Sequence, residues 1–133
     1  MGSVYAKTLI PLFAERIIMS YDFDVIITKN IHSANYTYNV SKMYYHAWDQ
    51  IKHNLDIPDY ELRGGSWREA IQLENKYAVR ALFAMIRQLE CYPEIYKPME
   101  PENGWGTYEG AIKFLKDTHK VMLKNTDARL VIS

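Results

Sequence analysis

The spacing of apolar residues changes at Val40, and this change limits the folds open to the chain. Residues 21–28 (YDFDVIIT) and 33–38 alternate and are rich in β-branched and aromatic side chains, which predicts two strands joined by a turn at residues 30–32. From Val40 onward apolar residues recur every three or four positions, which predicts a helix near 41–54. Asn39 or Ser41 is placed to cap that helix with a side-chain oxygen.

Two further helices and a final strand are predicted downstream. Ser66 and Glu69 have the spacing of a capping box, and an apolar stripe follows, which predicts a helix over 67–91. Thr107 is placed to cap a third helix over 107–124, and residues 92–106, with three prolines, predict an irregular surface segment. Residues 128–132 predict a short terminal strand.

This order of elements predicts an α+β fold. Strands at both ends of a set of helices favour one small antiparallel or mixed sheet with helices packed on one face. The terminal strand is expected beside the first, because its backbone groups need a partner. At 133 residues one domain is expected, spanning 19–133, with residues 1–18 as an N-terminal extension that forms a short helix.

Charge, the N-terminal residues and the cysteine count limit the partners and the compartment expected for the chain. Sixteen basic and sixteen acidic residues cancel, so no extended nucleic-acid patch is predicted. Pro11, Glu15 and Arg16 interrupt the apolar N-terminal residues, so no membrane segment is predicted. The single cysteine, Cys91, favours a reducing compartment such as the cytoplasm.

Two glycine-containing loops are the strongest candidates for a ligand site. Residues 63–66 (RGGS) and 103–107 (NGWGT) each open a predicted helix, whose first N–H groups can bind an anion. Arg63 and Arg68 would add guanidinium groups and Trp105 a stacking face, a combination that suits a nucleotide-like ligand. The alternative remains that these residues serve turns and caps alone.

A polar strand face is predicted to contribute to the same site. Asn35, Thr37 and Asn39 alternate onto one side of the second strand. If the chain has a ligand pocket, we expect this face to form it together with Tyr44 and the loop from Asn103 to Thr107.

Catalytic signals are weak. The chain contains no motif for a nucleophilic triad, a phosphate-binding loop or a zinc protease, and no cofactor is predicted. His46, Asp49 and His53 share a helix face, but His46 and His53 are about 10 Å apart along the axis, which is long for one metal ion. Glu74 lies in the apolar stripe of the second helix and is expected to pair with a Lys or Arg.

Three stretches of sequence stand out together: SYDFDVIIT near the start, ANYTYNVSKM at 34–43, and NGWGTYEG at 103–110 followed by the terminal ARLVIS. Through these stretches, over residues 19–133, the chain resembles a group of small, mostly uncharacterised proteins of bacteriophages and prophages. This resemblance implies no catalytic residue.

The resemblance implies an accessory protein that acts in the cytoplasm of a bacterial host. The first hypothesis is therefore a non-enzymatic protein that binds a host component and interferes with bacterial defence. A protein that binds or sequesters a nucleotide-like ligand is the alternative, and a small metal-dependent hydrolase is the second alternative. The aromatic surface is also compatible with a homodimer.

Overall fold

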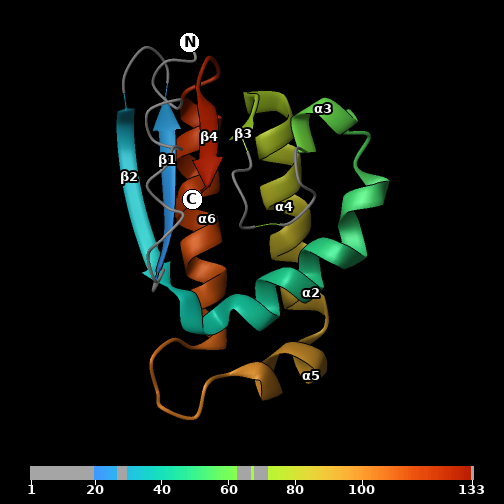
Figure 1. The fold of residues 1–133 in the computed structure, drawn as a ribbon, viewed down its shortest axis with the longest axis vertical. Coiled ribbons are helices and arrows are strands. Elements are labelled where there is room, and N and C mark those ends of the chain that lie inside the picture. The colour runs from blue at the N-terminus through green and yellow to red at the C-terminus, as the bar shows by residue number, and fades with distance from the viewer. Residues whose placement is uncertain (1–19, 27–29, 63–66, 68–71, 133) are drawn as a thin grey trace.

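The structure, a computed structural model, describes residues 20–26, 30–62, 67 and 72–132 (Figure 1). The predicted extension 1–18 and the loop 63–66, with Arg63, lie outside the described residues, as does Arg68. The elements follow in this order: β1 Ser20–Ile26, β2 Asn30–Thr37, a 3-10 turn Tyr38–Val40, α2 Ser41–Ile51, a 3-10 turn Lys52–Asn54, α3 Asp59–Leu62, β3 Gln72–Leu73, α4 Asn75–Cys91, α5 Pro93–Tyr96, a 3-10 turn Lys97–Met99, α6 Tyr108–Lys124 and β4 Arg129–Ile132.

The strands form an antiparallel sheet in the order β2-β1-β4-β3. β1 pairs with β2 over its whole length and with β4 through Phe23 opposite Ile132. The expected α+β fold, including the terminal strand beside the first, is confirmed. The predicted helices near 41–54 and 107–124 are also confirmed as α2 with its 3-10 turn and α6.

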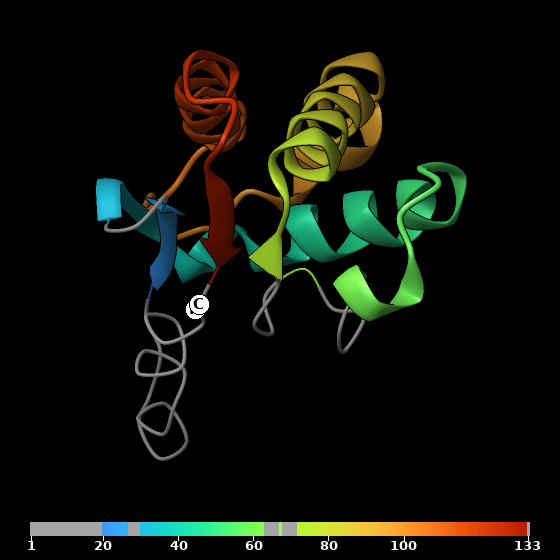
Figure 2. The same cartoon turned by 90° about the horizontal axis from the view of Figure 1, so that it is seen from above.

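The core lies between this sheet and the helices. Figure 2 shows α4 and α6 on the same face of the sheet. The fully buried ring of Phe23 in β1 packs on Phe114 of α6, with ring centroids 4.4 Å apart, and on Trp67 at 5.9 Å. Trp67 also contacts Trp48 of α2 at 5.2 Å, so one aromatic cluster joins the sheet, α2 and α6.

The predicted helix over 67–91 is wrong in its first part. Trp67 lies in a bend, Gln72–Leu73 is a strand, and the helix begins at Asn75. Leu73 is fully buried and lies opposite Leu130 of β4, so sheet pairing overrides the helical spacing. Glu74 is therefore an exposed residue at the N-cap position and not an acid within the apolar stripe.

Two smaller expectations are also corrected. The predicted turn at residues 30–32 belongs to β2, where His32 lies opposite Val25. The segment 92–106 is not irregular throughout, because Pro93 opens α5, and this short helix buries Tyr96.

None of the helices described has the length and apolarity that a membrane crossing requires.

The predicted side-chain cap of α2 is also absent. Val40 occupies the N-cap position, and no side chain caps the helix there. Asn39 lies in the 3-10 turn beyond β2, where its backbone N–H and its side-chain amide both donate to Thr37 Oγ1, at 3.1 and 2.7 Å. Asn39 therefore stabilises the turn between strand and helix and does not continue the strand face.

Candidate functional site

The loop before α6 carries a large aromatic side chain, Trp105, that is exposed to solvent. Trp105 is 68% exposed. Gly104 and Gly106, on either side of it, have φ angles of 77° and 105°, which side chains rarely adopt. The two glycines turn the backbone sharply, and the indole is left at the tip of the turn.

Hydrogen bonds within the loop fix this turn. The side chain of Asn103 accepts from the backbone N–H of Trp105 at 2.8 Å, an arrangement that holds an Asx turn. Glu100 Oε2 accepts from the N–H of Tyr108 at 2.7 Å, and Thr107 Oγ1 caps α6 by accepting from the N–H of Gly110 at 2.9 Å. Two N–H groups in the first turn of α6, those of Tyr108 and Gly110, therefore have acceptors within the chain.

The loop is also held against the end of β2. The N–H of Thr107 donates to the hydroxyl of Tyr36 at 3.1 Å. A Cβ built on Gly106 would lie 2.6 Å from Thr37 Cγ2 and 2.9 Å from Val40 Cγ1, so only glycine fits here. The backbone under Trp105 thus rests directly on the strand-to-helix joint.

The structure brings several of the predicted site residues together. Thr37, Asn39, Asn103, Trp105 and Thr107 lie at this one end of the fold, in the β2–α2 joint and the facing loop.

Tyr44 and Asn35, two further residues of the predicted site, do not join this group. Tyr44 is fully buried, and its hydroxyl donates to the carbonyl of Ala111 at 2.8 Å, so it supports the site from the core. Asn35 pairs in the sheet opposite Asp22, and its side chain is not described.

Acidic side chains surround the Trp105 loop. Glu100, Glu102 and Glu109 are exposed in or beside it. Burial of the Tyr108 hydroxyl raises its pKa, and the carboxylates of Glu90, Glu109 and Glu94 raise it further. Exposed carboxylates therefore gather in and beside the loop, with the ammonium of Lys97 5.6 Å from the Tyr108 ring, a local arrangement that the whole-chain charge of zero does not reveal.

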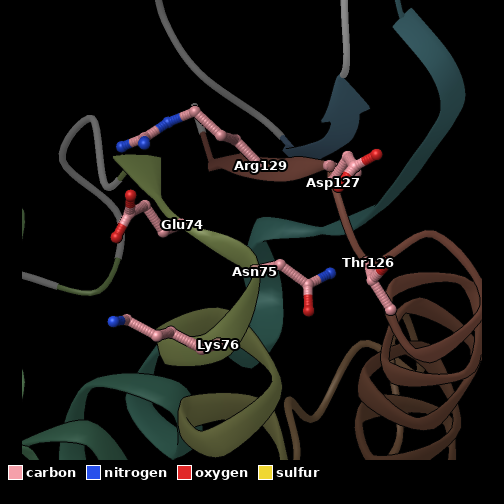
Figure 3. Close-up of a pocket in the computed structure, with 7 residues that line it drawn as sticks. Glu74, Asn75, Lys76, Thr126, Asp127 and Arg129 are labelled. Carbon is pink, nitrogen blue, oxygen red and sulfur yellow. The ribbon is translucent and has the colours of Figure 1, made fainter.

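A separate cleft of about 500 Å³ opens at the N-terminus of α4 (Figure 3). Its charged lining alternates in sign and comprises Glu74, Lys76, Asp127 and Arg129. Arg129 also forms an ion pair with the buried carboxylate of Glu61 at 3.3 Å. The cleft offers both donors and acceptors without a net charge. Sequence reasoning missed it because its lining comes from segments far apart in the chain.

Two of the three residues that share the helix face considered for a metal ion, His46 and Asp49, have other partners. His46 Nδ1 hydrogen-bonds with the hydroxyl of Tyr96 at 2.8 Å, and Asp49 forms an ion pair with Lys52 at 3.2 Å. Within the part of the chain that the structure describes, no group of three or more His, Cys, Asp or Glu residues is arranged to hold a metal ion.

Comparison with known proteins adds no relative. No protein family model matches the chain, and no curated protein or solved structure matches it either.

Proposed function

We propose that this chain is a binding protein that attaches to another protein through Trp105. In the setting that the phage resemblance implies, the partner is a protein of a bacterial host cytoplasm, and the consequence of binding is interference with a host defence system. No catalytic step is part of this proposal.

The observation that carries the proposal is an exposed indole on a backbone that is already fixed. An aromatic side chain of this size buries roughly 150–250 Å² when it packs, so its 68% exposure leaves much of that stabilisation unused within the chain. Trp is among the residues most enriched at the energetic centres of protein interfaces. Because the loop is preorganised, binding through it loses little conformational entropy.

The charges around Trp105 favour one kind of partner surface. Glu100, Glu102 and Glu109 would meet Lys or Arg side chains at the rim of an apolar pocket that receives the indole. The same carboxylates oppose a phosphate group at this loop, and the N–H groups of Tyr108 and Gly110 at the start of α6 already have acceptors within the chain. A protein partner therefore fits the loop better than a nucleotide-like ligand.

Affinity capture from bacterial lysate tests the proposal. Tagged wild-type chain, Trp105→Ala and Tyr60→Ala would be compared, because Tyr60 of α3 is 71% exposed and serves as the matched control. We expect a protein enriched by the wild type and by Tyr60→Ala but lost with Trp105→Ala. Equal enrichment by all three, or none by the wild type, would contradict the proposal.

A further inference from the structure

The outer side of α4 and α6 forms a second surface, distinct from the Trp105 loop. Phe83 of α4 is 52% exposed and Leu123 of α6 is 54% exposed. The ring of His119 lies between the two helices, 6.1 Å from that of Phe83. Figure 2 shows the two helices side by side above the sheet, so their outer sides face away from it. We call Phe83, His119 and Leu123, with the charged residues around them, the helix-pair face.

Contacts at both ends hold the helix-pair face rigid. At the start of α4, the side-chain amide of Asn75 donates to the carbonyls of Met122 and Asn125, both at 2.9 Å. Toward the other end of the pair, Lys116 of α6 forms an ion pair with Glu90 of α4 at 2.6 Å. The two helices therefore run antiparallel as one unit, and the exposed apolar side chains occupy a fixed surface.

The charge of the helix-pair face is positive. Its acids are engaged, since Glu90 pairs with Lys116 and Asp117 pairs with Lys113 at 2.7 Å. The exposed bases beside the apolar row are Arg87, Lys120 and Lys124. The guanidinium of Arg87 lies 6.0 Å from the ring of Phe83, so positive charge reaches the centre of the face.

We infer that the helix-pair face binds an acidic amphipathic helix of a partner protein. A third helix laid along the pair would place its apolar side on Phe83 and Leu123. Its flanking carboxylates would then meet Arg87, Lys120 and Lys124, which gives the interface both its orientation and its charge specificity.

Other occupants fit the helix-pair face less well. A second copy in an isologous dimer would bring the same positive face against itself, with like charges opposed. A nucleic-acid backbone would meet the lysines but leave Phe83 and Leu123 without apolar partners. The acidic helix satisfies both the apolar row and the excess positive charge.

The probe for this inference is a pair of synthetic peptides. Each has Leu and Phe on one helical face, and the remaining positions are Glu in one peptide and Lys in the other. Fluorescence anisotropy with the full chain should show binding of the Glu peptide that weakens as salt rises. Binding of the Lys peptide at equal or higher affinity would overturn the inference, as would no binding of the Glu peptide.

Variants locate the binding on the chain. Phe83→Ser and Lys120→Glu should each weaken binding of the Glu peptide by about tenfold, which corresponds to a loss of about 1.4 kcal/mol in binding free energy. The matched controls are the exposed residues Tyr60 and Lys42, as Tyr60→Ser and Lys42→Glu, which should bind as the wild type does. Unchanged binding by both test variants would overturn the inference. Self-association that Phe83→Ser abolishes would also overturn it, because the occupant would then be a second copy.

Discussion

The hydroxyl of Tyr36 accepts a hydrogen bond from the backbone N–H of Thr107 at 3.1 Å, a contact between residues 71 positions apart. The same hydroxyl occupies the space beside Gly110, where a Cβ would overlap it. The ring of Tyr36 stacks on Phe114 of α6 with centroids 5.6 Å apart. One side chain of β2 therefore positions both the Trp105 loop and the first turn of α6.

Removal of this hydroxyl should loosen the loop. Tyr36→Phe keeps the ring stacking but loses the bond to Thr107, so we expect the free energy of unfolding to fall by about 1 kcal/mol. Hydrogen exchange of the Thr107 amide should become faster than in the wild type. Tyr60→Phe is the control, since Tyr60 is largely exposed. Unchanged exchange at Thr107 would show that the hydroxyl does not hold the loop.

The close approach at Gly110 gives a second prediction. In an ordinary helix Gly→Ala stabilises by about 1 kcal/mol, but Gly110→Ala should destabilise because the new methyl overlaps the Tyr36 hydroxyl. In the Tyr36→Phe background the same substitution should cost much less. Urea unfolding of the four proteins in this double-mutant cycle measures the coupling. Additive effects of the two substitutions would contradict the packing described.

Local signals explain which parts of this end could be predicted. The glycines on either side of Trp105 and the cap at Thr107 act within a few residues, so the loop and the start of α6 could be predicted from the sequence. The role of Tyr36 depends on a partner on another element, and no local pattern contains it. The alternation continues past Thr37 and so predicts Asn39 on the strand face, although the backbone has already turned there.

The start of α4 could not be predicted from local sequence either. Residues before Asn75 carry helical spacing, but Leu73 is taken into the sheet by its pairing with Leu130. Whether a short apolar segment joins a sheet depends on an available strand edge, which is a property of the whole fold. The cleft lined by Glu74 and Arg129 could not be predicted either, because its lining residues come together only in the complete fold.

Asn75 joins the ends of the two long helices and should be important for stability. Asn75→Ala removes both bonds to the carbonyls of Met122 and Asn125, and we expect a loss of about 1–3 kcal/mol in the free energy of unfolding. Asn75→Asp should be destabilising as well, because it replaces the donor with oxygens that face carbonyl oxygens. Denaturant unfolding measures both, with the exposed Asn54→Ala as control. A stabilising Asn75→Asp would refute the assignment.

His119 should make stability depend on pH. Desolvation lowers its pKa below the ordinary value of 6.5, so the unfolded chain takes up this proton before the folded chain does. Well above pH 6.5 His119 is neutral in both the folded and the unfolded chain, so it does not lower the free energy of unfolding. As the pH drops below 6.5, the unfolded chain binds the proton more readily, and the free energy of unfolding falls. His119→Gln should remove this part of the acid sensitivity. Unfolding free energies measured across this range for both proteins test the prediction, and parallel curves would contradict it.

The central claim is that Trp105 is the anchor of a protein interface, and the affinity of the captured partner for purified variants tests it most directly. Trp105→Ala should leave the free energy of unfolding unchanged, because the side chain is exposed. It should weaken partner binding by about tenfold or more, as expected for an aromatic hot spot, while Tyr60→Ala binds as the wild type does. Equal affinity of the Trp105→Ala and wild-type chains for that partner would contradict the account.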